Sequence, residues 1–161
     1  MHTYYFLLGS NVGNRKENLT KAIDVIHKEI GTVIARSSVY ETEPWGLKDQ
    51  PDFYNMAIEV HSAMDPEKVF VKVKEIEQLL ERENNIKWGP RSIDVDILYC
   101  DQIVMKKDHL QIPHPQIYNR NFVLIPLMEI AGDYTDPVKK HTIEEIYDAC
   151  EDECEVFMLD D

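Results

Sequence analysis

The stretch that decides the fold reads Trp88-Gly-Pro-Arg-Ser-Ile-Asp-Val-Asp-Ile-Leu98, or WGPRSIDVDIL over residues 88–98. Apolar and polar residues alternate from Ile93 onward, and side chains two apart on a strand share a face. The alternation predicts a strand over 93–99 whose apolar side chains face a core. Asp94 and Asp96 then point the opposite way together, with Cα atoms roughly 6.5–7 Å apart.

The segments before this strand alternate between strand and helix patterns. A helix start is indicated by Asp65-Pro66-Glu67, in which an Asp cap precedes a Pro at the first helical position. Strands are predicted over 4–8, 32–40 and 54–61, and helices over 15–30 and 65–82.

The segments after this strand are shorter. A turn at 101–102 leads to a strand at 103–104, and short helices are predicted over 115–119, 125–131 and 142–149. The order β-α-β-β-α-β predicts an α+β fold, a ferredoxin-like core with a mainly antiparallel sheet, helices on one face, and extra C-terminal helices. We expect residues 1–161 to form a single domain with an acidic C-terminal segment over 144–161.

Composition and charge exclude several classes of protein. The 161 residues are 43% hydrophobic and 29% charged, which is ordinary for a globular domain. No apolar run is long enough to cross a bilayer. The N-terminal residues lack a signal-peptide pattern, so we expect a cytoplasmic protein. The net charge of −13 argues against nucleic-acid or membrane partners, although nine of the acids lie over 144–161 and leave room for a local basic site.

The two aspartates of the 93–99 strand are candidate metal ligands. Neighbouring carboxylates repel each other unless a cation lies between them, and Mg²⁺ prefers oxygen ligands that it shares with phosphates. Arg91 offers bidentate phosphate contacts, and Trp88 offers a ring for stacking on a heterocycle. Together they indicate magnesium–nucleotide binding. The alternative is a solvated acidic strand face beside a tryptophan that packs in a core.

Two further features suit phosphate or nucleotide binding. His114 and Arg120 share a similar face if the segment between them is helical, and together they suit phosphate oxygens. Glu77 falls on the apolar stripe of its helix, where a carboxylate usually has a partner or a ligand. The alternatives are a surface histidine with a solvated arginine, and a glutamate at the edge of the stripe.

A polar and aromatic cluster before and within the 54–61 strand suits a planar ligand. Thr42 and Asn55 offer hydrogen bonds and Phe53 offers a ring, although the same residues also fit a plain turn and strand start. The opening Gly9-Ser10-Asn11 lacks the Gly-Lys-Ser/Thr ending of a phosphate-binding loop, so it is interpreted as a turn before a helix.

These motifs follow one another along nearly the whole chain, in an order that is typical of one known family. They are Gly9-Ser10-Asn11, the run from Tyr40 and Thr42 through Pro44, Gly46, Gln50-Pro51 and Phe53 to Asn55, Glu77, Arg82, the block 88–97, Pro113-His114, Arg120, Phe122-Val123-Leu124 and Pro126-Leu127. In this arrangement the sequence resembles the 6-hydroxymethyl-7,8-dihydropterin pyrophosphokinases of folate biosynthesis. The acidic segment after Glu144 lies outside the resemblance.

The resemblance implies transfer of the terminal pyrophosphoryl unit of ATP to the pterin hydroxymethyl oxygen, leaving AMP. It implies two Mg²⁺ ions held by Asp94 and Asp96, and a monomeric enzyme whose partners are ATP and the pterin. The implied catalytic residues are Arg82, Arg91, Asp94 and Asp96. The implied ATP-binding residues are Glu77, Trp88, Arg91, Ile97, His114 and Arg120. The implied pterin-binding residues are Thr42, Pro44, Trp45, Phe53, Asn55, Asp94 and Phe122.

One departure from the family pattern and two rival functions remain. Members of the family usually carry Gly-Arg-x-Arg where this chain has Glu81-Arg82-Glu83-Asn84, so a second arginine is missing at Asn84.

A magnesium-dependent nuclease or nucleotidyl transferase would use the same aspartates but needs a basic groove. A non-catalytic ferredoxin-like ligand-binding module would have no reason to gather these acids and arginines.

Overall fold

The computed structural model describes residues 1–42, 52–83 and 92–159. Within them the helices are α1 (Arg15–Glu29), α2 (Pro66–Glu83), α3 (Asn121–Ala131) and α4 (Ile143–Ala149). The strands are β1 (His2–Ser10), β2 (Thr32–Arg36), β3 (Tyr40–Thr42), β4 (Phe53–Ser62), β5 (Asp94–Cys100), β6 (Met105–Lys106), β7 (Gln111–Ile112) and β8 (Val156–Met158). The helix start at Pro66 is confirmed.

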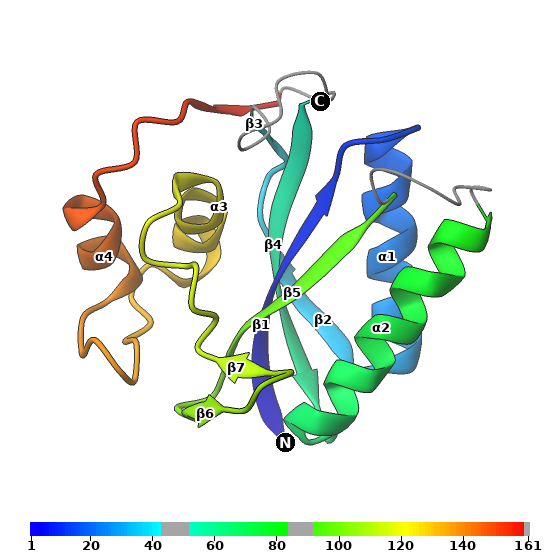
Figure 1. The fold of residues 1–161 in the computed structure, drawn as a ribbon, viewed down its shortest axis with the longest axis horizontal. Helices are drawn as coiled ribbons and strands as arrows, with labels where there is room; N and C mark the ends of the chain where they lie inside the picture. The colour runs from blue at the N-terminus through cyan, green and yellow to red at the C-terminus, as the bar shows by residue number, and fades with distance from the viewer. Residues whose placement is uncertain (43–51, 84–91, 160–161) are drawn as a thin grey trace.

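The main sheet confirms the predicted antiparallel, ferredoxin-like core. Its strand order is β5-β1-β4-β3-β8, and β2 also pairs with β4. Each of these pairs is antiparallel. Helix α1 follows β1 and helix α2 follows β4, and each returns the chain to the sheet (Figure 1). Strands β1 and β4 are neighbours in the middle of the strand order. The β6–β7 hairpin forms a separate small sheet beside β5.

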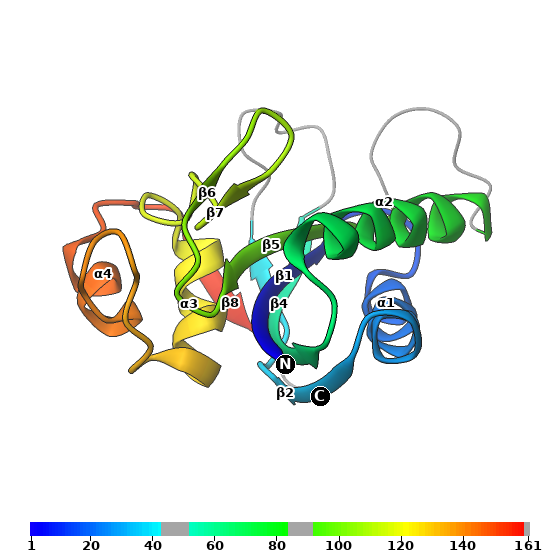
Figure 2. The ribbon, with the colours of Figure 1, turned by 90° about the horizontal axis from the view of Figure 1, so that it is seen from below.

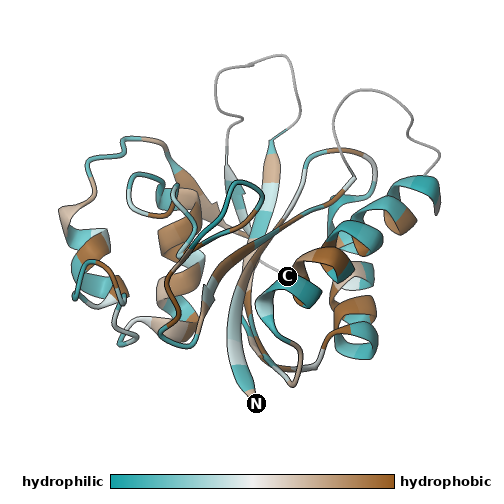
Figure 3. Cartoon of the chain, turned by 60° about the horizontal axis from the view of Figure 1, so that its bottom comes forward, coloured by the Kyte–Doolittle hydropathy of each residue, from teal (hydrophilic) through white to brown (hydrophobic). Residues whose placement is uncertain are grey.

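Helices cover both faces of the sheet. Helices α1 and α2 lie on one face, as expected for the core, whereas α3 and α4 lie on the other (Figure 2). The expectation of helices on one face therefore holds only for the β-α-β-β-α-β core, because the C-terminal helices add a third layer. Helix α3 lies between the sheet and α4, and it is coloured mainly as hydrophobic in Figure 3.

Each face of the sheet has its own hydrophobic core. Alternate residues of β1 divide between them: Tyr4, Phe6 and Leu8 pack with α1 and α2, while Tyr5 and Leu7 pack with α3 and α4. A strand buried on both faces lacks the polar–apolar alternation of a surface strand, which explains the continuous apolar sequence of β1. The central strand thus fixes the two helical layers relative to each other.

The predicted strand over 32–40 is in fact two strands, β2 and β3. Between them Ser37 replaces part of the ladder, because its Oγ accepts a hydrogen bond from the backbone N–H of Ala57 at 2.9 Å. The Ser37 backbone N–H donates to the Ala57 carbonyl at 2.9 Å as well. A polar side chain that bonds a neighbouring backbone competes with regular pairing, and β3 leaves β2 at this point.

The predicted helix over 115–119 is wrong, and α3 begins earlier than expected. Residues 115–119 form turns, and the backbone N–H of Gln116 donates to the His114 ring at 3.1 Å. The Ile117 backbone N–H also donates to the His114 carbonyl at 3.4 Å, which is the i to i+3 bond of a β-turn rather than the i to i+4 bond of an α-helix. Helix α3 then begins at Asn121 rather than at Ile125.

The acidic C-terminal segment contains a strand that the sequence did not predict. Strand β8 pairs with β3 at the edge of the sheet. Its Phe157 and Met158 are each 56% exposed, so hydrogen bonding rather than burial fixes its position. Among the described residues, no helix combines the length and the apolar character that a membrane span requires.

Candidate active site

Two of the residues predicted to bind pterin or metal, Asn55 and Asp94, lie in one row with Gly9 near one end of the strands β4, β1 and β5. Gly9 on β1 lies opposite Asn55 on β4 and opposite Asp94 on β5. Neighbouring strands lie about 4.8 Å apart, so Asn55 and Asp94 are separated by about 10 Å across β1. Leu8 and Met56 are buried against α1 and α2, which turns their strand neighbours in this row toward the α3 face.

Gly9 leaves the space that this row needs. A Cβ atom at position 9 would lie 2.8 Å from Oδ1 of Asn55 and 3.8 Å from the ring of Phe53. The first distance is shorter than a van der Waals contact, so a larger residue would displace the Asn55 side chain. Glycine in a strand interior often marks such a close approach.

The end of β1 is also fastened to the beginning of β5. The Ser10 hydroxyl donates to the carbonyl of Ser92 at 2.6 Å, and the Asn18 amide donates to Ser10 Oγ at 3.1 Å. Asn14 caps α1 by accepting from the Glu17 backbone N–H at 3.1 Å. Gly9 and Ser10 are therefore the last residues of β1, so the interpretation of Gly9-Ser10-Asn11 as a turn is wrong for these two, and the chain turns only after them, before the capped helix.

Thr42 and Asn55 form a buried polar pair at the outer end of the row. The Asn55 amide donates to Thr42 Oγ1 at 2.9 Å, and the two residues are 2% and 3% exposed. Phe53 is half-buried on the same face of β4. Phe122, the second residue of α3, is half-buried and packs against the α3–α4 core. The predicted pterin residues Pro44 and Trp45 lie outside the described residues.

The side chains of Asp94 and Asp96 on β5 point away from the core into which Val95 and Ile97 are packed. Val95 and Ile97 are buried, 3% and 5% exposed, whereas Asp94 is half-buried and the Asp96 side chain is 49% exposed. Two carboxylates on one strand face, one of them open to solvent, are a hard-oxygen donor set that fits Mg²⁺. The predicted placement of Asp94 and Asp96 on one face is therefore confirmed.

Glu77 connects α2 to the backbone between these carboxylates. Its Oε2 accepts from the Val95 backbone N–H at 2.9 Å, and its Oε1 accepts from Lys74 Nζ at 3.2 Å. Only 6% of the Glu77 side chain is exposed. The carboxylate on the apolar stripe thus has a partner, and that partner is the strand that carries Asp94 and Asp96.

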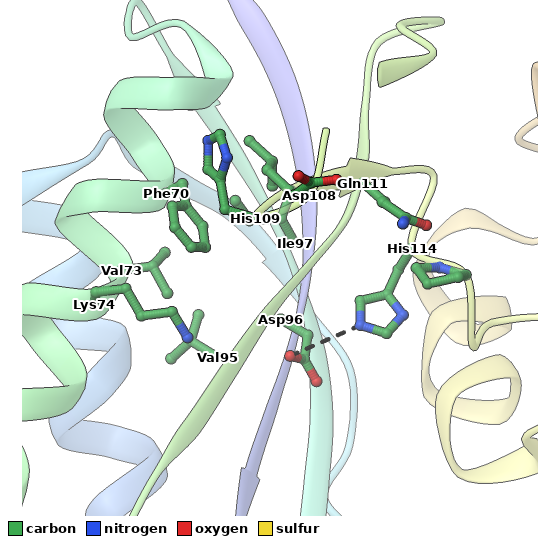
Figure 4. A pocket seen from close by; sticks show the side chains of 12 residues that line it. Phe70, Val73, Lys74, Val95, Asp96, Ile97, Asp108, His109, Gln111 and His114 are labelled. Carbon is green, nitrogen blue, oxygen red and sulfur yellow. Dashed lines mark ion pairs between the residues drawn. The ribbon is translucent and has the colours of Figure 1, made fainter. Parts of the chain in front are cut away.

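A cavity of about 300 Å³ lies beside Asp96, between α2, β5 and the segment 108–115 (Figure 4). Predicted residues Asp96, Ile97 and His114 line it. The other lining residues are Phe70, Val73 and Lys74 of α2, Val95, and Asp108, His109, Leu110, Gln111 and Pro115. The mixture of apolar walls with a few polar groups is typical of a small-molecule site.

His114 is a neutral donor that faces Asp96. Its Nδ1 accepts from the Gln116 backbone N–H at 3.1 Å, and its Nε2 lies 4.0 Å from Asp96 Oδ1 (Figure 4). Burial lowers the pKa of His114, with Asp96 opposing and the positive charge of Arg120 adding to the decrease. The neutral ring with Nδ1 as acceptor carries its proton on Nε2, toward Asp96.

The three predicted arginines do not all lie at the cavity beside Asp96. Arg120 lies with its guanidinium carbon 5.5 Å from the centre of the Phe122 ring, near enough to His114 to affect its pKa. Arg82 is exposed at the end of α2 and lines a groove between α1 and α2 rather than the Asp96 cavity. Arg91 lies outside the described residues, as do Trp88 and Asn84.

The sequence did not single out two α2 residues of the cavity, Phe70 and Lys74. Lys74 Nζ lies 5.4 Å from the centre of the Phe70 ring, and it is the cation closest in sequence to Glu77. Their spacing of four residues, with Glu77 three further on, places all three along one helix face. That spacing was the available signal.

Comparison with known proteins gives consistent results. Residues 5–132 match the family described as 7,8-dihydro-6-hydroxymethylpterin-pyrophosphokinase. A Bacillus subtilis protein named 2-amino-4-hydroxy-6-hydroxymethyldihydropteridine pyrophosphokinase is 39% identical over 127 residues, covering 78% of this chain and 76% of that protein. An Aquifex aeolicus protein of the same name is 35% identical over 145 residues, covering 90% of each chain.

Solved structures support the same fold. The wild-type HPPK-DHPS of Plasmodium falciparum superposes with a TM-score of 0.75 at 18% identity, over 92% of this chain. This chain spans 44% of that larger protein, so the likeness concerns one part of it. The fold agrees with the sequence relationship, and the chain belongs to the 7,8-dihydro-6-hydroxymethylpterin-pyrophosphokinase family.

Proposed function

We propose that this chain transfers the pyrophosphoryl group of ATP to the hydroxymethyl oxygen of 6-hydroxymethyl-7,8-dihydropterin, yielding the pterin diphosphate and AMP. Its membership of the pyrophosphokinase family supports this reaction. The single observation that supports it is the row Asn55–Gly9–Asp94, in which an amide side chain suited to a planar polar ring lies one strand away from the strand that carries the two carboxylates. Neither the nuclease nor the non-catalytic module is favoured.

ATP is proposed to bind along β5, with its base in the cavity beside Asp96. The apolar side chains of Phe70, Val73 and Ile97 suit the faces of a base, and polar groups of 108–111 suit its edges. The triphosphate then lies toward His114 and Arg120. Neutral His114 donates from Nε2, and Arg120 offers bidentate contacts, so both suit phosphate oxygens.

Asp94 and Asp96 are the residues proposed to hold magnesium. The family is ATP-dependent and generally requires Mg²⁺, and we propose two ions per site. When bound, Mg²⁺ neutralises phosphate charge and lowers the pKa of the attacking hydroxyl. The part of this chain is to hold the two carboxylates on one rigid strand, and Glu77 assists by bonding the backbone of Val95 between them.

The pterin is proposed to bind at the other end of the row. Thr42 and Asn55 offer directed hydrogen bonds to its ring edge, Phe53 and Phe122 offer apolar faces, and Pro44 and Trp45 complete the set. The hydroxymethyl oxygen then attacks the β-phosphorus in line. One P–O bond forms to the pterin oxygen, the bond to the AMP oxygen breaks, and the hydroxyl proton passes to solvent.

Arginines are proposed to stabilise charge as that bond breaks. Arg82 lies shortly before the segment 84–91 and Arg91 is its last residue. These two are proposed as the catalytic cations, and Trp88 of the same segment is proposed to bind ATP. We propose further that residues 1–161 act as one monomeric domain in the cytoplasm, without nucleic-acid or membrane partners. Nuclease chemistry would need a broad basic surface, which a net charge of −13 disfavours.

Calorimetric titration separates the three candidate functions. We expect the pterin to bind the wild-type chain only weakly alone and tightly when a non-hydrolysable ATP analogue and Mg²⁺ are both present. A nuclease would ignore the pterin, and a ligand-binding module would bind without metal. Either of those two results would reject the proposed function.

A further inference from the structure

The C-terminal segment after α4 connects two separate parts of the proposed pterin site. It runs from α4 past the beginning of α3 to β3 at the edge of the sheet (Figure 1). The match to the family description ends at residue 132, before this segment begins. It contacts the beginning of α3, next to Phe122, and it contacts β3, which ends at Thr42.

Helix α3 is capped by Asp152, a residue distant in sequence, and not by the residue that precedes the helix. The residue before the helix, Arg120, makes no side-chain cap bond. Instead Asp152 Oδ2 accepts from the Asn121 backbone N–H at 2.8 Å, and the Asn121 amide donates to the Asp152 carbonyl at 2.8 Å. The second carboxylate oxygen accepts from the Cys154 backbone N–H at 2.9 Å. Both oxygens are therefore engaged, and a negative charge lies at the positive end of the helix dipole.

The capped residue lies between two proposed ligand contacts. Asn121 is flanked by Arg120, proposed for phosphate, and by Phe122, proposed to stack on the pterin. One hydrogen bond from the Asn121 backbone N–H and one from its side-chain amide fix the start of α3. Phe122 lies inside that helix, whereas Arg120 precedes it in extended backbone, so the bonds act mainly on Phe122. The carboxylate of Asp152 would repel the triphosphate, so it suits a role in positioning rather than in contacting the substrates.

Strand β8 fixes the other part of the site. It pairs with β3 so that Val156 lies opposite Thr42 and Phe157 opposite Glu41. The Leu159 backbone N–H donates to the Val39 carbonyl at 2.9 Å. Alternate residues of an antiparallel strand face the same neighbour, so the N–H of Phe157 also points toward β3. Strand β3 has only three residues, and β8 gives it a second ladder opposite β4.

We propose that the segment 152–159 is a positioning strap for the pterin site, which holds the Phe122 end of α3 and the Thr42 end of β3 at a fixed separation, with Asp152 as its principal positioning residue. The inference rests on the proposed function. The cavity beside Asp96 is lined by α2, β5 and 108–115, without any residue of the strap. Loss of the strap therefore weakens pterin binding more than ATP binding.

The first test compares Asp152 with its neighbour. We expect Asp152→Ala to weaken pterin binding about tenfold, the size of a lost helix cap, and to change the affinity for the ATP analogue less than about twofold. Asp152→Asn keeps an acceptor oxygen and should recover part of the affinity. Glu151→Ala is the matched control, since it removes an exposed acid one residue earlier and should leave both affinities unchanged. Calorimetry with Mg²⁺ present measures both.

A second pair of variants keeps the test decisive if Asp152→Ala fails to fold. Phe157→Pro removes the N–H that faces β3, whereas Phe157→Ala removes only a side chain that is 56% exposed. We expect pterin binding to weaken in the proline variant and to stay at the wild-type value in the alanine variant. Thermal melts show whether each variant is folded.

The outcomes separate this inference from the function on which it rests. A wild-type chain that binds no pterin would overturn both. A wild-type chain that binds pterin, with Asp152→Ala or Phe157→Pro binding it equally well, would overturn the strap alone. Equal weakening of pterin and ATP binding in folded variants would also overturn it, because the proposed effect is larger for the pterin than for ATP.

Discussion

The two faces of the sheet show how one strand can serve a core and a site at once. On the α1/α2 face, β1 presents Tyr4, Phe6 and Leu8, each 0% exposed. On the α3 face, Tyr5 and Leu7 are buried, but the next position is Gly9, between Asn55 and Asp94. The first face is apolar from Tyr4 to Leu8 and ends in Ser10, whose hydroxyl donates to the Ser92 carbonyl. The second face changes from apolar packing to polar groups already at Gly9. The proposed chemistry is therefore located where the apolar packing of the second face ends.

The largest expected effect comes from the polar part of the second face. Asp96→Asn keeps the shape of the side chain but removes the charge that would hold Mg²⁺. We expect turnover to fall by at least about 10²–10³, the usual cost of losing a stabilising group. The melting temperature without metal should not fall, because repulsion between neighbouring carboxylates is relieved. Steady-state activity across a Mg²⁺ titration and a melt measure the two effects.

Asp24→Asn provides the control for that variant. Asp24 is an exposed acid of α1, so its replacement changes the net charge equally without touching β5. It should retain wild-type activity. Near-normal turnover of Asp96→Asn at ordinary Mg²⁺ would return the two aspartates to a plain solvated strand face.

A core substitution on the α1/α2 face should show the opposite pattern. Ile26 of α1 is 0% exposed, and Ile26→Ala should lower the free energy of unfolding by about 2–5 kcal/mol. Turnover per folded molecule should stay at the wild-type value, because α1 contributes no residue to the cavity beside Asp96 or to the Asn55–Gly9–Asp94 row. Urea unfolding and active-site-normalised rates measure this. A comparable loss of turnover in fully folded protein would mean that the faces are not separate.

A single methyl group at the centre of the row should affect the site moderately. Gly9→Ala places a Cβ atom 2.8 Å from Asn55 Oδ1, and overpacking of this kind costs about 1–3 kcal/mol. We expect pterin affinity to fall about tenfold as Asn55 shifts, with ATP-analogue affinity less affected. Unchanged pterin binding would show that Asn55 does not contact this substrate.

The smallest effect concerns the pH dependence of stability. Burial lowers the pKa of His114 in the folded chain, so the unfolded chain binds this proton more readily. The stability that the neutral ring supplies is present above the ordinary pKa of about 6.5 and is lost as the pH falls below it. Wild-type protein should therefore lose stability more steeply than His114→Gln between about pH 7 and pH 5. Parallel slopes in urea unfolding would contradict the assignment.

Local sequence patterns predicted the core well because its elements follow local rules. The Asp65-Pro66 start of α2 and the alternation around Asp94 each depend on a few neighbouring residues. The same alternation predicted that both aspartates share a face. Asn55 and Asp94 lie on opposite sides of Gly9 because β1 lies between β4 and β5. To predict this arrangement one must know the order of the strands in the sheet, which no local sequence pattern contains.

The missed elements depend on partners that are distant in sequence. The Ser37 hydroxyl interrupts the strand over 32–40 by bonding Ala57, 20 residues away. Helix α3 begins at Asn121 because Asp152, 31 residues later, caps it. Strand β8 lies in a segment rich in Asp and Glu, a composition typical of solvent-exposed loops. Its strand conformation depends on the hydrogen-bonded pairing with β3, which lies more than 100 residues earlier in the sequence. Phe70 and Lys74 were passed over because their spacing equally fits an ordinary helix face.

The most direct test of the central claim is phosphorus NMR of the products from ATP, Mg²⁺ and 6-hydroxymethyl-7,8-dihydropterin. If the polar part of the second face transfers the pyrophosphoryl group as one unit, AMP and a pterin diphosphate appear together, in equal amounts and only when the pterin is present. Formation of ADP with a monophosphorylated pterin, or of AMP without the pterin, would contradict the account.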